Sequence, residues 1–481
     1  MELYFRAFKM LFEKYILRKN TGIVIKEFCE KMGVVYIKLA QILSTQNHGN
    51  YFTEEDRQQL STICDSCNPI SFSEIEKILK EEYGENFDKL FLKIDPVPIG
   101  SASISQVHRA ILKNGEEIVL KIKRKDITNN IEKDIERIRK LMNRYGPIFK
   151  FSNLIGGNQA LNLYLKMIKE ETDFEHEVNN IKLYHKFKDE VNGQVENTKK
   201  IIIPKLYEEL CTKNVIVMEY IKYPTLNNME LTEENKKIIF SGISSYLRLS
   251  FYAVFNDKQV VFHGDPHVGN IFFDNDGNIG FLDMGLLFAL SPEDAELVKN
   301  FFFAAYTGNY EKLFKLLSKY GIWTEDKKLR FKEDLKKFCE EVSDKDVTYY
   351  FTDMIKICLN YDFLPPDFLY YMAKPFVCLN GINVVSNAMI SCKSLLEQQI
   401  IEYYIRKNLE NSIDILINSL KLSPQLIYNI EKYGLTKGIS YTASNNVENL
   451  KELKKVLENY NDLLDMFKNS YCPKSKSKVK K

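Results

Sequence analysis

The sequence predicts an α+β fold in which a strand-rich lobe is joined through a hinge to a larger helical lobe. Two apolar runs turn back at Asn114-Gly115 and Asp276-Gly277, pairs that strongly favour tight hairpin turns. The apolar strand Val215–Tyr220 leads into Ile221–Leu226, a linker that contains Pro224. Apolar residues at helical spacing prevail elsewhere. The predicted segments are a helical extension (1–92), the strand-rich lobe with inserted helices (93–222), the helical lobe (223–470) and a basic tail (471–481).

The composition is that of a globular protein with room for two or three domains. Apolar residues make up 45% and charged residues 27% of the 481 positions. A net charge of +2, without a basic stripe, gives no general case for a nucleic-acid partner. The nine cysteines show no disulfide framework, and Cys64 and Cys67 lack a second pair at zinc spacing. These features predict an intracellular protein in a reducing compartment.

No apolar run reaches the roughly 18 residues of a membrane span, so we expect no transmembrane segment. Residues 376–390 come closest, but one glycine and three asparagines interrupt them. Residues 1–20 form an amphipathic start with five basic side chains. This pattern suits a helix packed on the protein better than a membrane-surface segment or a transit peptide. Peripheral membrane association and an organelle remain open alternatives.

Residues 1–92 carry helix signals. Thr53–Asp56 and Ser71–Glu74 are helix starts of the capping-box type, and Gly84 ends the second of these helices. Lys38 and Gln41 lie three positions apart and therefore share a helical face that is otherwise mostly apolar. On composition alone, Lys38 would extend its ammonium group to water.

From Pro96 onward the pattern changes to strand and loop. Ile99–Ser105 is rich in small residues and feeds the first hairpin, where backbone N–H groups can bind nucleotide phosphates. Gly100 is its one glycine, so the loop is not a G-x-G-x-x-G motif. Lys121 lies inside an apolar strand, where an unpaired ammonium group is unfavourable. We therefore expect an anionic partner for Lys121; the alternative is a solvent-exposed lysine on an edge strand.

Two charged helices are predicted after this hairpin, over residues 126–150 and 159–188. The second is predicted as one continuous helix, on which Asp173 and Glu177 share a face and Glu171 lies nearby. Because acidic helical faces usually point to solvent, this pattern by itself assigns no function.

The C-terminal half is predicted to be mostly helical. An apolar stripe from Ile239 to Val254 predicts a buried helix, and Ser291-Pro292 begins another. Helices are predicted to continue over residues 325–470, with an amphipathic helix at Asn446–Phe467 that packs within its domain. The basic tail Lys474–Lys481 is predicted to be solvated rather than bound to acidic lipid or nucleic acid.

The stretch Val261–Leu287 carries the residues best suited to chemistry. Asp265 and Asn270 form a D-x-x-x-x-N loop, and Asp283 begins a D-x-G sequence. Phosphoryl transfer needs a carboxylate that orients the acceptor and oxygen ligands that hold Mg²⁺ against nucleotide phosphates. A hairpin turning at Asp276-Gly277 would bring Asn270 and Asp283 together. The alternative is an ordinary hairpin with solvated acids.

Taken in order, four motifs resemble those of the UbiB family of atypical, protein-kinase-like proteins, which are linked to ubiquinone and other isoprenoid-lipid metabolism. The resemblance extends from about Lys31 to about Ser291. The motifs are K-x-G-Q at Lys38–Gln41, an alanine-rich loop at Ile99–His108, E-x-D at Glu171–Asp173, and H-x-D-P-H-x-G-N at His263–Asn270 followed by D-x-G at Asp283–Gly285.

This resemblance implies a two-lobed protein-kinase-like fold with the N-terminal helical extension packed over the active site. It implies that Lys121 pairs with nucleotide phosphates and is held by Glu177. Asp265 takes the position of the catalytic aspartate, and Asn270 and Asp283 become the Mg²⁺ ligands.

The resemblance also implies a nucleotide pocket and a regulatory set. The pocket residues are Ser101, Ala102, Ser103, Ile104, Ser105, Lys121, Met218, Glu219 and Tyr220. The regulatory residues are Lys38, Gln41, Glu171 and Asp173, with Lys38 able to reach Glu171 or Asp173. Two features depart from the family pattern: Ala40 replaces the glycine of K-x-G-Q, and serines replace several loop alanines.

The implied activity is that of an atypical kinase or ATPase that uses ATP (or ADP) and Mg²⁺. An occluding extension makes a protein substrate less suitable than water or a small lipid-like acceptor. The resemblance also implies a possible contact with an isoprenoid lipid or a membrane surface. One alternative is a small-molecule phosphotransferase of the aminoglycoside or choline kinase type, which also carries His-Gly-Asp, here at 263–265. The other is a nucleotide-binding pseudokinase scaffold.

Overall fold

The computed structural model describes residues 20–45, 53–61, 69–125, 131–140, 157–342, 347–361, 363, 365–386, 394–396, 399–400 and 403. The chain divides into two compact units, Met1–Glu397 and Gln398–Lys481, and all elements named below belong to the first. Four sequence expectations lie outside the described residues: the segment 1–19, the Cys64 and Cys67 pair, the helix at 446–467 and the basic tail.

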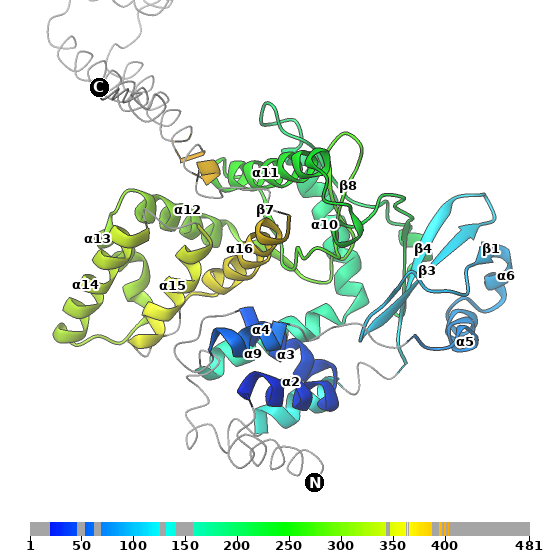
Figure 1. The fold of residues 1–481 in the computed structure, drawn as a ribbon, viewed down its shortest axis with the longest axis horizontal. Coiled ribbons are helices and arrows are strands. Elements are labelled where there is room, and N and C mark those ends of the chain that lie inside the picture. The colour runs from blue at the N-terminus through cyan, green and yellow to red at the C-terminus, as the bar shows by residue number, and fades with distance from the viewer. Residues whose placement is uncertain are drawn as a thin grey trace, which may run out of the picture. The chain divides into compact units, whose positions relative to one another are not determined.

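The first helices form a small bundle. Helices α2 (Thr21–Met32), α3 (Val34–Thr45) and α4 (Glu54–Ser61) pack on one another and on α9 (Gly157–Glu171), as Figure 1 shows. Asp56 joins two of them, because its carboxylate accepts hydrogen bonds from the backbone N–H of Gly22 and of Thr53. The buried core of the bundle includes Val35 and Ala40 of α3 and Leu165 of α9.

A five-stranded antiparallel sheet follows. Its strands are β1 (Phe91–Ile94), β2 (Gly100–Ser101), β3 (Ser105–Leu112), β4 (Glu117–Lys123) and β6 (Val215–Glu219), in the order β1-β3-β4-β6 with β2 paired to β3. The predicted Asn114-Gly115 turn is confirmed: Gly115 has a φ of 90°, which a side chain would disfavour.

Side chains alternate between the two faces of this sheet. Ile118, Leu120 and Ile122 pack with Ile75 and Leu79 of α5 (Phe72–Tyr83). The intervening residues of β4, including Lys121, therefore point away from α5. The predicted start and end of α5 are confirmed by the Ser71–Glu74 capping box and by Gly84. The short helices η2 (Gly84–Asn86) and α6 (Phe87–Leu90) connect α5 to β1.

The predicted continuous helix over residues 159–188 is wrong. The chain forms two helices, α9 and α10 (Phe174–Val191), that are separated at Thr172-Asp173. Asp173 is the N-cap of α10: its carboxylate accepts hydrogen bonds from the N–H groups of Glu175 and His176. An aspartate that caps a helix satisfies N–H groups that a continuous helix would have bonded internally. Residues 131–140 are helical, within the first charged helix that was predicted.

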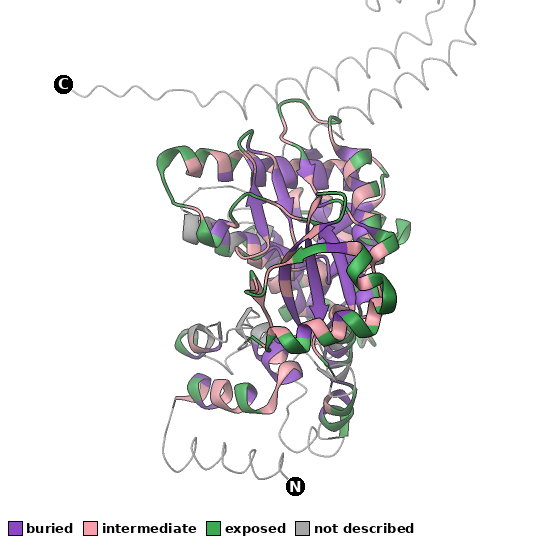
Figure 2. Cartoon of the chain, turned by 90° about the vertical axis from the view of Figure 1, so that its right-hand side faces the viewer, coloured by how far each residue is buried: buried purple, intermediate pink, exposed green. Residues whose placement is uncertain are grey.

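Two small sheets are built mainly from strands that follow the linker. Strand β7 (Val260–His263) pairs with β10 (Leu287–Leu290), and β8 (Ile271–Phe273) forms the predicted hairpin with β9 (Ile279–Phe281). Strand β5 (Ile201–Ile202) adds to β9 in parallel, a pairing that sequence reasoning did not anticipate. Figure 2 shows buried residues concentrated in the strands and in the helices packed on them.

The other described elements are helices, which confirms the α+β class. Helix α11 (Glu233–Phe255) is buried along the predicted stripe. The helices after α11 are α12 (Pro292–Tyr306), α13 (Tyr310–Leu317), α14 (Glu325–Val342), α15 (Val347–Asn360) and α16 (Asp367–Ser386). Three further short 3₁₀ helices lie in connecting segments of the described chain: η3 (Glu208–Leu210), η4 (Leu226–Asn228) and η5 (Ser318–Tyr320).

Within the described ranges, α11 is the one helix long and apolar enough to cross a membrane, and 72% of its apolar window is buried inside the protein. Residues 376–390, which we expected to come closest to a span, are described only as far as Ser386.

Candidate active site

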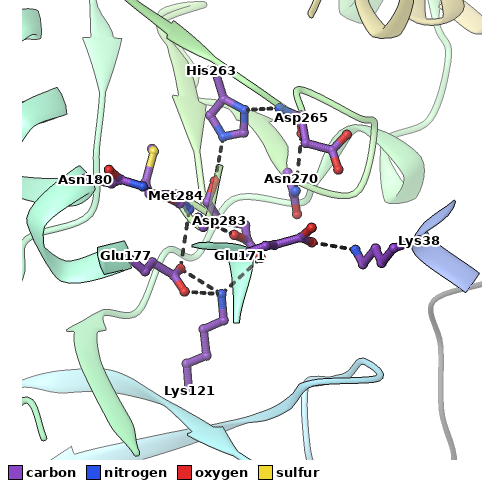
Figure 3. Close-up of polar contacts among 11 residues, drawn as sticks. Lys38, Lys121, Glu171, Glu177, Asn180, His263, Asp265, Asn270, Asp283 and Met284 are labelled. Atoms are coloured by element: carbon purple, nitrogen blue, oxygen red, sulfur yellow. Dashed lines mark hydrogen bonds and ion pairs between the residues drawn. The ribbon is translucent and has the colours of Figure 1, made fainter. Parts of the chain in front are cut away.

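His263 connects the two loops that carry the predicted chemistry (Figure 3). Its Nε2 lies 2.6 Å from the carbonyl oxygen of Asp283, and its Nδ1 lies 3.1 Å from the backbone nitrogen of Asp265. A carbonyl can only accept and a backbone N–H can only donate, so the ring is neutral with its proton on Nε2. Burial lowers the pKa of His263 to about 4, which keeps this arrangement intact at neutral pH.

The hairpin places Asn270 beside the loop of Asp283. The backbone N–H of Leu282 donates to the carbonyl oxygen of Asn270 at 2.9 Å. The amide Nδ2 of Asn270 donates to the backbone carbonyl of Asp265 at 3.4 Å. The prediction that the hairpin brings Asn270 close to Asp283 is therefore confirmed, and the structure places Asp265 beside Asn270 as well.

Lys121 joins strand, helix and loop in a charged cluster (Figure 3). Its Nζ lies 2.7 and 2.8 Å from the two carboxylate oxygens of Glu177 and 3.0 Å from Oδ2 of Asp283. The side chain is 10% exposed and its strand is internal to the sheet, so the alternative of an exposed edge lysine is wrong. Glu177 is fully buried in the first turn of α10.

Charge and burial oppose one another in this cluster. Burial alone would lower the pKa of Lys121, but Asp283 and Glu177 outweigh it and raise that pKa. Burial raises the pKa of Glu177 to about 7, against the opposing effect of Lys121. For Asp283, burial is outweighed by Lys121 and by the N–H of Gly285, so its pKa is lowered. Lys121 and Asp283 are thus charged at neutral pH.

Two of the four expected regulatory residues meet. Lys38 Nζ lies 2.5 Å from Oε1 of Glu171, the last residue of α9. Asp173 is exposed and caps α10 instead of facing Lys38. The side chain of Gln41 lies outside the described residues. Ala40, the departure from the motif glycine, is fully buried among the N-terminal helices.

The loop at Gly100–Ser105 is tied to the end of β4 by a residue that the sequence did not single out. Arg124 donates from Nε to the carbonyl of Ala102 at 2.9 Å and from Nη2 to the hydroxyl of Ser101 at 2.8 Å. The side chains of Ser103 and Ser105 are buried. Ile104 is buried as well, and its carbonyl accepts from the N–H of Arg124.

Gln106 and His108, the last polar residues of the second motif, face α5 rather than the charged cluster. Gln106 exchanges hydrogen bonds with the backbone of Ile70, just before α5. Its Nε2 lies 2.9 Å from Nε2 of His108, whose Nδ1 lies 2.8 Å from the carbonyl of Asp95. These two residues join elements of the fold.

The three predicted hinge residues differ in exposure. Met218 is buried and paired in register with Val119. Glu219 is exposed and accepts a hydrogen bond from the N–H of Lys205. The guanidinium group of Arg109 lies 4.6 Å from the ring centroid of Tyr220.

Sequence reasoning missed two residues of α16 that contact Asp265. Lys374 Nζ lies 3.3 Å from Oδ2 of Asp265, and Cys378 Sγ lies 3.7 Å from Oδ1. Burial would raise the pKa of Asp265, but Lys374, then His267 and Lys38, outweigh it and lower that pKa to about 2. The one available signal was that Lys374 is the single lysine in the apolar helix from 367 to 386.

Known proteins are similar to the part of the chain that carries most of these site residues. A family model described as the ABC1 atypical kinase-like domain matches residues 62–317. An uncharacterized protein of the hydrogenase 1 5' region of Clostridium pasteurianum is 31% identical over 304 residues, covering 62% of this chain and 54% of that protein. A probable protein kinase UbiB of Histophilus somni is 28% identical over 357 residues, covering 71% of this chain and 63% of that protein.

A chloroplastic, uncharacterized aarF domain-containing protein kinase of Arabidopsis thaliana is 27% identical over 327 residues, covering 67% of this chain and 58% of that protein. The chain thus spans 54% to 63% of the length of these three relatives. Among solved structures, the complex of a Mycobacterium tuberculosis protein with erythromycin is similar at a TM-score of 0.47 and 18% identity, covering 77% of this chain and 93% of that one.

Proposed function

The chain belongs to the ABC1, or UbiB-type, family of atypical kinase-like proteins, and we propose that it binds ATP or ADP with Mg²⁺ and transfers or hydrolyses the terminal phosphoryl group. The observation that carries this proposal is the contact of Lys121 with both Glu177 and Asp283. Kinases use such a lysine, held by a helix carboxylate, to bind nucleotide phosphates next to a metal-binding aspartate.

The residues present suit Mg²⁺ that arrives with a nucleotide. The described residues contain no group of three or more His, Cys, Asp or Glu side chains that could hold a metal ion alone. Mg²⁺ commonly uses one or two protein oxygens and completes its shell with phosphates and water. Asp283 is 42% exposed, and Asn270 is held nearby by Asp265 and Leu282. When bound, Mg²⁺ would neutralise charge on the phosphate oxygens.

In this proposal different residues of the chain bind the phosphates, orient the acceptor and border the nucleotide. Lys121 contacts the phosphates, and Glu177 keeps its ammonium group in place. Asp265 is ionised at neutral pH and orients the acceptor oxygen by accepting its hydrogen bond. The loop Ser101–Ser105, held by Arg124, and the hinge residues Met218 to Tyr220 border the nucleotide.

The acceptor is proposed to be water or a small lipid-like molecule, in or near isoprenoid-quinone or lipid metabolism. The Lys38–Glu171 ion pair supports this choice, since it ties α3 to the end of α9. A small-molecule phosphotransferase with an open acceptor cleft has no need of this ion pair. Contact with a membrane surface would come from segments outside the described residues or from a partner.

Nucleotide binding is tested by thermal shift with ATP and Mg²⁺. We expect stabilisation of the wild type and a reduced shift for Asp283→Asn, because the carboxylate would no longer face the metal as an anion. Glu234→Gln, an exposed acid in the first turn of α11, is the control and should keep the full shift. No shift in the wild type, or an equal shift in Asp283→Asn, would refute the proposal.

Turnover is tested by measuring phosphate release with and without isoprenoid-quinone precursors and acidic lipid. Stimulation by a precursor would identify a lipid-like acceptor, whereas release that is unaffected by either addition would identify an ATPase. If Asp265→Asn abolishes turnover but fully retains function in cells, the protein acts as a nucleotide-binding scaffold instead.

A further inference from the structure

One turn of α16 holds both carboxylate oxygens of Asp265. Lys374 contacts Oδ2 at 3.3 Å, and Cys378, four residues later, contacts Oδ1 at 3.7 Å. Residues four apart lie on the same face of a helix. The face of α16 that carries Lys374 and Cys378 is therefore directed at Asp265.

Lys374 supplies a positive charge that the catalytic loop lacks. The loop from His263 to Asn270 contains neither lysine nor arginine. Lys121 is paired with Glu177 and Asp283, and Lys38 is paired with Glu171. Among the described residues, Lys374 is the lysine that forms an ion pair with Asp265, and its side chain is 19% exposed.

We propose that Lys374 is a catalytic residue that positions Asp265 and then contacts the transferred phosphoryl group. This inference rests on the proposed ATP-dependent reaction. An acceptor hydroxyl or water bound to Asp265 lies about 2.6–3.2 Å from the carboxylate. The ammonium group of Lys374, at 3.3 Å from the same carboxylate, is close enough to meet the phosphoryl oxygens as they reach the acceptor.

The step balances without a further reactant. A bond forms between the acceptor oxygen and the γ-phosphorus as the bond from that phosphorus to the bridging oxygen breaks. ADP leaves with the electron pair, and the acceptor proton passes through Asp265 to solvent. Lys374 keeps its proton throughout and stabilises negative charge on the equatorial oxygens.

Cys378 also contacts the carboxylate of Asp265, but as an uncharged group. Burial, then the charge of Asp265, raise the pKa of this thiol, so it is neutral and donates a weak S–H hydrogen bond. Of Lys374 and Cys378, Lys374 is thus the charged residue. A substitution that removes the charge of Lys374 but keeps a side chain of similar size separates its electrostatic effect on turnover from its effect on packing.

The test uses the full-length chain and measures kcat and KM for ATP turnover together with the ATP-induced thermal shift. Lys374→Gln should lower kcat roughly 10²-fold, because one preorganised donor to the transition state is lost. The KM for ATP and the thermal shift should stay within about twofold, since Lys121 still binds the phosphates. Lys374→Met should behave in the same way, and Lys374→Arg should recover most of kcat.

Lys299→Gln is the matched control. Lys299 is a buried lysine of α12. Its Nζ lies 2.9 Å from Oδ1 of Asp257 and 2.6 Å from Oε2 of Glu296. This variant should keep wild-type kcat, which would show that loss of a buried lysine pair does not by itself reduce turnover.

Wild-type kcat in both Lys374→Gln and Lys374→Met would overturn this inference and leave the proposed function intact. Loss of the ATP-induced shift together with kcat, without recovery in Lys374→Arg, would also overturn it by showing a structural role. Absence of any ATP-induced shift in the wild type would instead refute the proposed function, and this inference with it.

Discussion

Glu177 has no exposure to solvent, and among the described residues its ion-pair partner is Lys121, which also contacts Asp283. Removing Lys121 from such a buried pair leaves the carboxyl group of Glu177 without its partner, so this group must either stay charged in the interior or take up a proton, and both cost stability. The packing of α10 against the sheet is therefore linked to the chemistry at Lys121, because the same carboxylate serves both.

Lys121→Met is expected to reduce the free energy of unfolding by roughly 3–5 kcal/mol, because Glu177 would remain buried without its partner. The double variant Lys121→Met/Glu177→Gln should be more stable than Lys121→Met alone. Urea denaturation measures both, and Lys205→Met, at an exposed lysine, is the control. Equal stability of the single and double variants would contradict this account.

His108 makes the stability of the sheet depend on pH. Burial lowers its pKa, against the hydrogen bond to Asp95, so the folded protein binds this proton less readily than the unfolded chain does. The unfolded chain takes up the proton as pH falls below the ordinary value of about 6.5. Stability therefore rises with pH through this range and decreases as pH falls.

We expect His108→Gln to show a shallower loss of thermal stability between pH 7 and pH 5 than the wild type. The other buried histidines retain their contribution, so a part of the slope should remain. His176→Gln, at a half-exposed position on α10, is the matched control. A slope in His108→Gln that equals the wild-type slope would assign the effect to other groups.

At the scale of elements, the break between α9 and α10 separates two tasks. Glu171 ends one helix and meets Lys38, while Glu177 lies in the first turn of the next helix and meets Lys121. Asp173 makes this division by capping α10. A cap at this place stabilises the turn that holds Glu177.

Asp173→Ala should therefore reduce the free energy of unfolding by about 0.5–2 kcal/mol, since two backbone N–H groups lose their acceptor. Asp173→Asn should retain most of that stability, because asparagine also caps helices. Urea denaturation distinguishes the two variants. If Asp173→Asn were as destabilised as Asp173→Ala, the charge of the residue rather than its cap would be responsible.

Local chemistry explains which elements could be predicted. The turns at Gly115 and Gly277, the cap at Ser71 and the proline-led start of α12 depend on residues within a few positions of one another. The continuous helix over 159–188 was wrong because Thr172-Asp173 resembles an ordinary polar stretch within a charged helix. A side chain that caps a helix and a side chain that faces solvent are both polar, so the periodicity of apolar residues does not distinguish them.

At the scale of the molecule, the N-terminal helices are connected to the rest of the site through Lys38 and Glu171. Their side chains are 10% and 19% exposed, so this ion pair is only partly screened by water. Ala40, two residues after Lys38 in the same helix, is fully buried in the core of the N-terminal bundle.

A double-mutant cycle of Lys38→Met and Glu171→Gln should give a coupling free energy of roughly 0.5–3 kcal/mol in urea denaturation. The reason is that each side chain loses its partner when the other is changed. The exposed pair Lys182 and Glu208, treated in the same way, is the control and should show weaker coupling. Additive effects at Lys38 and Glu171 would show that the ion pair does not connect the two helices energetically.

The sequence by itself determined the α+β class and both hairpins, because turn chemistry and strand alternation act over a few positions. It also predicted that Lys121 has an anionic partner and that Asn270 and Asp283 lie close together. Tertiary structure decided which carboxylate meets Lys38, that Arg124 holds the small-residue loop, and that Lys374 of α16 reaches Asp265. Residues far apart in sequence meet only when whole helices and strands pack on one another. The spacing of residues along the chain does not show which helices and strands will pack together.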